Sequence, residues 1–170
     1  GFDEAYRKPC IEDIELGYRL KQAGYSISLC KNIQVKHLKR WEPVSLLKAE
    51  IFYRALPWTE LILRQRHFNA DLNLSYTNRL SVVFVFGVIG SLIASIFIPL
   101  FLIVTVALVL GLLLMNINVY RFFYRKRGFL FTCCVVPWHW LYFLYSGIAF
   151  AYGTLTYYKW SSGGLLSKTG

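Results

Sequence analysis

Long apolar runs dominate the second half of this chain. Leu80 to Tyr120 contains no charged residue, and Phe129 to about Tyr157 contains no Asp, Glu, Lys or Arg. A membrane-spanning helix needs about 20 predominantly apolar residues, so the first run is long enough for two spans. Pro99 lies near its middle and favours a break there. The pattern predicts a hairpin of spans at 80–98 and 100–119, a third span at about 130–157, and a tail at 158–170.

The residues before this region are polar, and their first regular element is a helix from Glu12 to Leu20. We expect it to close at Gly24, because glycine best tolerates the left-handed conformation just past a helix end. On a helical wheel Asp13 shares one side with the apolar positions, so it is expected to be a buried acid. Glu15 and Arg19 lie on the other side, four residues apart, and are expected to pair.

Asp13 has two interpretations at this stage. The positive end of the helix dipole stabilises its negative charge, so it suits the role of a general base for a hydroxyl group. Acids in a first helical turn also commonly serve only to stabilise the helix end. The helix by itself does not decide between these two roles.

Two short segments beyond the helix alternate between apolar and polar residues, at Tyr25–Leu29 and Ile33–Leu38. Such alternation is typical of strands. A strand, a helix and a strand of this size predict the closing part of an α/β domain, which we place at residues 1–42.

Pro43 to Arg66 shows helical periodicity. Pro57 is expected to begin a second helical segment, since proline is tolerated in a first turn but not in a helix interior. The apolar stripe recurs at spacings of three and four residues: Val44, Leu47, Ile51, Ala55, Trp58 and Ile62. This stripe fits either a helix that lies in the membrane interface or a helix that packs on the soluble domain. His67 to Asn78 is polar and reads as a loop, so residues 43–79 form one connecting region.

Composition and charge support a membrane protein. The chain is 56% hydrophobic with a mean hydropathy of +0.43 and a net charge of +10. The cations gather at the ends of the apolar runs, at Arg79 and at Arg121–Arg127, so we expect membrane lipids rather than nucleic acid as the partner. Because two spans separate these two cationic clusters, both clusters are expected on the cytoplasmic side of a plasma membrane. The third span then places the tail outside.

The remaining reactive side chains are interpreted as structural. His139 lies between Trp138 and Trp140, where an interfacial histidine is favoured over a functional one. The cysteines match neither a metal-ligand spacing nor a secreted disulfide pattern, and are expected to be free thiols: Cys10, Cys30, Cys133 and Cys134.

Four segments together carry a family likeness: Gly-Phe-Asp-Glu at 1–4, EDIELGYRLKQAGY at 12–25, RFFYRKRG at 121–128 and HWLYFLYSG at 139–147. The chain resembles the C-terminal part of membrane-bound family 2 glycosyltransferases, similar to cellulose and hyaluronan synthases. The resemblance implies a catalytic domain of GT-A fold. It also implies an inverting transfer of a sugar from a nucleotide-sugar donor to a glycan or lipid-linked acceptor.

The resemblance also implies residue roles. Asp13 ends an acidic Glu-Asp motif and takes the role of general base, with Glu12 as a supporting or a solvent-facing acid. HLKRW at 37–41 is similar to the Gln-x-x-Arg-Trp motif of these enzymes, with His in place of Gln. By this likeness Arg40 binds the donor diphosphate and Trp41 the acceptor.

Two further site residues follow from the same likeness. Trp58 is a second aromatic expected to stack on a sugar ring. His37 is either a ligand of the catalytic metal or an ordinary core histidine.

The sequence lacks one part of the family's site. No Asp-x-Asp motif occurs in it, and in this family that motif holds the divalent metal, Mg or Mn, and the donor diphosphate. We therefore expect a C-terminal fragment that is inactive alone. Its expected protein partner is either a second copy of the chain in a homo-oligomer or a separate channel protein. The alternative is a non-catalytic multi-pass membrane protein, such as a transporter segment or scaffold.

Overall fold

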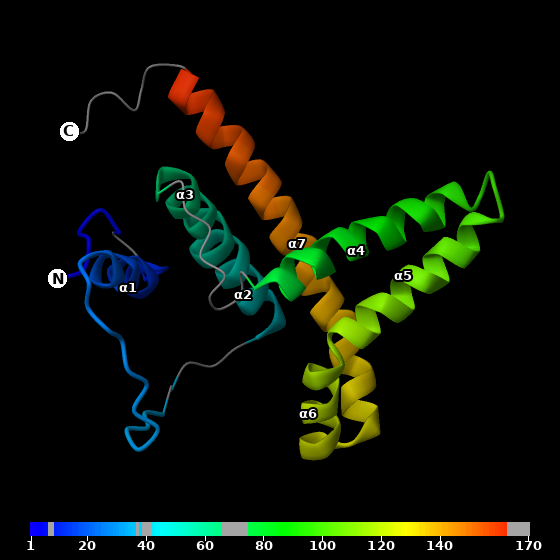
Figure 1. Ribbon diagram of the computed structural model, residues 1–170, viewed down its shortest axis with the longest axis horizontal. Helices are drawn as coiled ribbons and strands as arrows, with labels where there is room; N and C mark the ends of the chain where they lie inside the picture. Colours follow the sequence, from blue (N-terminus) through cyan, green and yellow to red (C-terminus); the bar gives the residue numbers. More distant parts are fainter. Residues whose placement is uncertain (7–8, 37, 39–41, 66–74, 163–170) are drawn as a thin grey trace. The chain divides into compact units, whose positions relative to one another are not determined.

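The computed structural model describes residues 1–6, 9–36, 38, 42–65 and 75–162. The chain divides into two compact units (Figure 1). The first, here called the polar unit, comprises Gly1–Arg66 and Tyr152–Gly170. The second, here called the hairpin unit, comprises His67–Ala151.

Every regular element in the described residues is helical. In chain order these are α1 (Glu12–Gln22), α2 (Pro43–Lys48), the π-helical segment η1 (Ala49–Ala55), α3 (Leu56–Gln65), α4 (Tyr76–Ala94), α5 (Phe101–Met115), α6 (Ile117–Arg127) and α7 (Phe129–Ser162).

The predicted α/β domain is wrong: the described part of the chain contains no strand. The first alternating segment, Tyr25–Leu29, has no regular structure, nor do residues 33–36 of the second. Leu29 is 88% exposed and Val35 is 89% exposed. A strand is stabilised by backbone pairing and by packing of one face on a core. These segments have neither, so their alternating pattern alone does not produce a strand.

The predicted helix is confirmed as α1, and so is its end. Gly24 has φ +84°, and the backbone N–H of Tyr25 reaches back to the carbonyl of Leu20 at 3.0 Å. The predicted buried side is wrong, because Asp13 is exposed. The buried positions are Ile11, just before the helix, and Glu15 and Tyr18 within it.

The helical run from Pro43 to Gln65 changes its winding in the middle. Pro57 lacks an N–H, and its ring clashes with the carbonyl four residues earlier in a regular helix. The seven residues of η1 adopt the wider π-helical form directly before this position, and α3 begins at Leu56. A local π-helical adjustment is a common response to such a conflict. The prediction that Pro57 starts a second segment is confirmed.

The core of the polar unit is built around α3. Trp58 is 6% exposed, and its Nε1 donates to the hydroxyl of Tyr18 in α1 at 3.2 Å. Leu61 and Ile62 are buried beside it along the same helix. The last turns of α7 also pack on α3, since Gly153 lies against the Thr59 side chain. Of the predicted stripe, Trp58 and Ile62 are buried, whereas Val44 at its start is 78% exposed.

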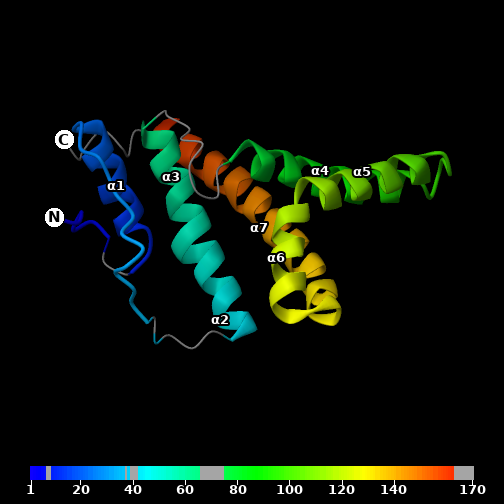
Figure 2. The same ribbon diagram turned by 60° about the horizontal axis from the view of Figure 1, so that its bottom comes forward.

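The hairpin unit begins with two antiparallel helices, α4 and α5, which lie side by side (Figures 1 and 2). The break predicted at Pro99 is confirmed, since α4 ends at Ala94 and α5 begins at Phe101. Small residues line the contact between the two helices. A side chain at Gly111 would meet the ring of Phe84 at 2.7 Å, so the glycine allows a close approach.

A bend of 64° at Asn116 separates α5 from α6. This side chain is buried, and its Nδ2 donates to the Leu112 carbonyl at 2.9 Å and to the Ser81 hydroxyl at 3.0 Å. The amide therefore satisfies a carbonyl near the end of α5 and ties the bend to α4. The sequence predicted one span at 100–119, whereas the structure ends α5 at Met115 and adds a separate helix.

The described helices include two that are long and apolar enough to cross a membrane. They are Tyr76–Ala94 and Phe129–Lys159, and the bent pair α5 and α6 makes a third if it is counted as one span. Within the hairpin unit α7 packs on the hairpin through Phe143, which is fully buried against Val85 and Leu112. The composition-based prediction of a membrane protein agrees with these helices.

Candidate functional site

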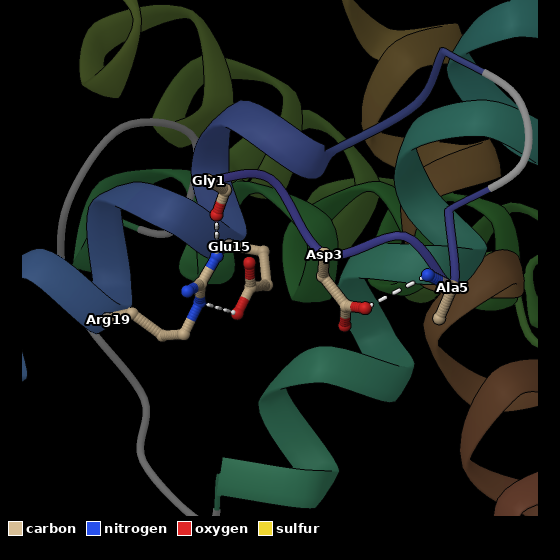
Figure 3. A network of polar contacts seen from close by, with 5 residues as sticks. All are labelled: Gly1, Asp3, Ala5, Glu15 and Arg19. Carbon is tan, nitrogen blue, oxygen red and sulfur yellow. Dashed lines mark hydrogen bonds and ion pairs between the residues drawn. The ribbon is translucent and has the colours of Figure 1, made fainter.

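The structure brings together the two segments that carry the strongest family likeness. The Arg19 guanidinium of α1 lies between the Glu15 carboxylate and the carbonyl oxygen of Gly1 (Figure 3). Its Nε donates to Glu15 Oε1 at 2.6 Å, and its Nη2 donates to the Gly1 oxygen at 2.7 Å. Asp3 holds the first segment in a turn by accepting the N–H of Ala5 at 2.9 Å. Residues 1–4 therefore fold back onto α1.

This arrangement favours the charged form of Arg19, which arginine already adopts at neutral pH. The hydrogen bond that Arg19 donates to Glu15 raises the pKa of the Arg19 guanidinium, and the charges of Glu15 and Asp3 act in the same direction. The predicted pair of Glu15 and Arg19 is confirmed. It holds the first segment to the helix as well as stabilising α1.

Glu12 and Asp13 lie in the first turn of α1, where the helix dipole favours negative charge. Glu12 Oε2 accepts the backbone N–H of Cys10 at 2.6 Å, which anchors the chain entering the helix. Asp13 Oδ1 accepts the N–H of its neighbour Ile14 at 2.9 Å. Because Asp13 is exposed, its carboxylate is accessible to a molecule in solution. The two acids differ in accessibility, since Glu12 is half-buried.

Glu15 is the buried acid of α1, a position that the sequence assigned to Asp13. It is 7% exposed, and its Oε2 is buried with no hydrogen-bond partner among the described residues. Burial raises the pKa of the nearby Tyr6 hydroxyl to about 12, and the Glu15 charge adds to this effect. The signal for this face was present as Ile11, Glu15 and Tyr18, spaced by four and three residues.

Cys10 lies just before α1 and is partly buried. Burial raises the pKa of the Cys10 thiol, an effect that its backbone hydrogen bonds partly offset. The thiolate is the reactive form of cysteine, so Cys10 remains a protonated thiol at neutral pH. It is not a candidate nucleophile.

The predicted aromatic ligand Trp58 forms part of the protein core. Its indole is buried and bonded to Tyr18, so in this structure its ring packs against protein. The proposed role in stacking on a sugar stays a prediction. His37, Arg40 and Trp41 lie outside the described residues, and their predicted roles stay predictions as well.

A separate hollow of about 410 Å³ lies in the polar unit between the α3 region and the end of α7. Its lining combines aromatic rings with a few polar groups: Phe52, Leu56, Pro57, Glu60, Tyr152, Gly153, Thr156 and Tyr157. Glu60 in this lining pairs with Arg64 at 2.6 Å. The sequence did not predict this hollow, because its two walls are far apart in the chain.

The described residues do not form a metal site by themselves. No three His, Cys, Asp or Glu side chains gather in the part of the chain that the structure describes. Glu15, the acid nearest the first segment, already binds the cationic Arg19. The divalent metal implied by the resemblance therefore finds no ligand set in these residues.

Comparison of the chain with protein-family models, with curated proteins and with solved structures gave no match.

Proposed function

We propose that this chain is part of a membrane-bound inverting glycosyltransferase, with Asp13 as the general base. The observation that carries the proposal is the exposed Asp13 carboxylate in the first turn of α1, beside Glu12. A general base must reach the proton that it removes, and an exposed carboxylate at a helix N-terminus meets that requirement.

The segment around residues 1–4 adds support. Arg19 ties the Gly1 carbonyl to α1, so both parts of the motif that resembles family 2 glycosyltransferases lie at one place. The membrane-spanning helices agree with an enzyme that works at a membrane surface, on a glycan or on a lipid-linked acceptor.

The proposed step begins with an acceptor hydroxyl beside Asp13. The carboxylate accepts the hydroxyl proton while the acceptor oxygen forms a bond to the anomeric carbon of the donor sugar. The bond from that carbon to the nucleoside diphosphate breaks, and the diphosphate leaves with the electron pair. Attack from the opposite face inverts the anomeric centre. Glu12 supports the negative potential of the site through its position next to the base.

The test compares variants of the full-length protein in isolated membranes. Membranes are incubated with labelled nucleotide sugars, and label in the lipid and polymer fractions is measured. Asp13→Asn keeps the shape of the side chain but cannot accept the proton, so transfer is expected to fall roughly 10²–10⁴-fold. Binding of the nucleotide sugar is expected to be retained.

Glu50→Gln is the matched control, because it removes one acidic charge outside the motif, at a residue paired with Arg54. Asp13→Glu keeps a carboxylate and is expected to retain part of the activity. Transfer by Asp13→Asn at the level of the Glu50→Gln control would exclude Asp13 as the base.

A non-catalytic multi-pass membrane protein is the second candidate. The contact between Asp13 Oδ1 and the N–H of Ile14 favours it, since an acid that bonds its local backbone can serve only to stabilise the helix end. In that case no nucleotide sugar acts as a donor, and Asp13→Asn lowers only the stability of α1.

A further inference from the structure

The short helix α6 carries an unusual concentration of positive charge. Arg121, Arg125, Lys126 and Arg127 fall within seven residues, and no Asp or Glu follows Asp71 in the sequence. Among the described residues none of these four cations forms an ion pair. Like charges one turn apart on a helix destabilise it. An anion from outside the chain would relieve that repulsion.

One face of α6 gathers polar and cationic side chains around an open hollow. Residues at 118, 121, 122, 125 and 126 recur at helical spacing and line a hollow of about 380 Å³. Asn118, Arg121 and Arg125 provide hydrogen-bond donors there, and Lys126 adds a further charge. Arginine forks match phosphate oxygens, and a planar guanidinium can donate two bonds to one phosphate.

The opposite face of α6 is held against α7, so the cationic face points away from α7. Tyr120 is 6% exposed, and its hydroxyl accepts the Trp140 Nε1–H at 3.2 Å. The Phe123 ring lies 5.8 Å from the ring of Phe131, between centroids. Gly128, with φ +83°, allows the tight turn between the two helices. Both ribbon views show α6 beside the first part of α7 (Figures 1 and 2).

The bend at Asn116 suits a position at a membrane surface. Helix α5 has fifteen residues and no charge, so it extends about 22 Å at 1.5 Å per residue. The apolar core of a bilayer is about 30 Å thick, so α5 crosses about three quarters of it. Together with the apolar residues 96–100 before it, α5 is long enough to bring Asn116 close to the boundary of that core. The 64° bend then directs α6 away from the axis of α5. Exposed Phe122 and Tyr124 beside the cations are typical of interfacial helices.

We propose that the outward face of α6 binds the phosphate headgroups of acidic phospholipids, with Arg121 and Arg125 as the principal ligands. Asn118 and Lys126 complete the site. The lipid phosphate is favoured over a soluble phosphate because the site lies at the end of an apolar helix and includes the exposed ring of Phe122. This role does not depend on the proposed glycosyl transfer.

The test measures lipid selectivity directly. The full chain is reconstituted in phosphatidylcholine vesicles with a trace of spin-labelled phosphatidylglycerol or phosphatidylcholine. Electron paramagnetic resonance gives the relative association of the two labels with the protein. We expect selectivity for phosphatidylglycerol at low ionic strength, and a loss of about fivefold for each arginine removed by Arg121→Gln and Arg125→Gln.

The matched control is the double variant Arg54→Gln and Arg64→Gln, which removes two cations that are already paired with Glu50 and Glu60. It is expected to keep the selectivity. Unchanged selectivity in the α6 variant, or an equal loss in the control, would overturn the proposal.

Two further measurements refine the assignment. The first distinguishes a specific arginine site from a general effect of positive charge, and the second distinguishes a lipid ligand from a soluble diphosphate. Arg121→Lys with Arg125→Lys keeps the charge but removes the guanidinium forks, so a partial loss is expected. Full retention of selectivity in this variant would overturn the assignment of arginine ligands. Displacement of the labelled phosphatidylglycerol by uridine diphosphate would assign the site to a soluble diphosphate instead and would also overturn the proposal.

Discussion

The two units of this protein satisfy their polar groups in different ways. Among its described residues the polar unit buries one charged side chain, Glu15, and Arg19 links it to the Gly1 carbonyl. The buried polar residues described in the hairpin unit are neutral: Asn116 donates to Ser81, and Ser91 bonds Thr105 at 2.8 Å. The acids follow the same division, since the hairpin unit contains none beyond Asp71.

This difference follows from solvent. Water solvates a charged group, so a charge near water destabilises the fold little. A charge in an apolar medium raises the free energy of the fold unless it is paired. Hydroxyl and amide groups carry no net charge and find partners on neighbouring helices. The polar unit can therefore hold an accessible acid such as Asp13, while the hairpin unit is suited to packing. The cations of α6 are an exception at its edge, where headgroups are expected.

The largest expected effect tests whether the units are stabilised separately. Trp58→Ala in the polar unit and Phe143→Ala in the hairpin unit each remove a buried aromatic side chain. Each is expected to cost about 3–5 kcal/mol. Hydrogen–deuterium exchange should show a loss of protection mainly in the unit that carries the change.

Trp138→Ala is the control for this pair, because Trp138 is 43% exposed and its removal opens little buried volume. Equal loss of protection in both units from either core variant would mean that they unfold as one body.

A smaller effect tests the close packing of the hairpin unit. A Cβ at Gly147 would lie 2.5 Å from the ring of Phe86 and 2.8 Å from Val82. Gly147→Ala is therefore expected to lower the free energy of unfolding by about 1–3 kcal/mol, as measured by thermal unfolding in detergent. Gly90→Ala in α4 is the matched control, since nothing lies within 4 Å of that position. Without a clash, it should gain up to about 1 kcal/mol from the better helix propensity of alanine. Equal unfolding temperatures for the two variants would contradict the proposed contact.

The smallest effect is a pH dependence confined to the polar unit. The pKa of Tyr6 is raised from 10.0 to about 12, chiefly by burial. Below pH 10 the hydroxyl is protonated in both the folded and the unfolded chain, and the stability is fully present. Between pH 10 and 12 the unfolded chain releases the proton first, so stability falls as the pH rises.

Tyr6→Phe should remove this part of the fall in stability. It should also remove one tyrosine that ionises near pH 12 from the phenolate absorbance titration. A titration in which Tyr6 ionises near pH 10 would show that the side chain is not buried beside Glu15.

Local patterns predicted most of the helices. Gly24 ended α1 because glycine tolerates the positive φ found there. Pro57, in the first turn of α3, and Pro99, between α4 and α5, act locally because proline fixes φ and lacks an N–H. The candidate site was less predictable. Helix α1 has apolar residues on two sides, with Leu16 on one and Tyr18 on the other, so its wheel did not reveal which side is buried. Trp58, forty residues beyond Tyr18, decides it through a hydrogen bond.

The sequence by itself determined that the chain has a polar first part, apolar helices with cations at their ends, and an acidic motif at the start of a helix. These follow from composition and from short-range periodicity. Only the tertiary structure showed that Glu15 is buried while Asp13 is exposed, that the described residues of the alternating segments form no strand, and that α6 turns away from α5 at Asn116. Such features depend on contacts between residues distant in the chain, and no local pattern contains the partner.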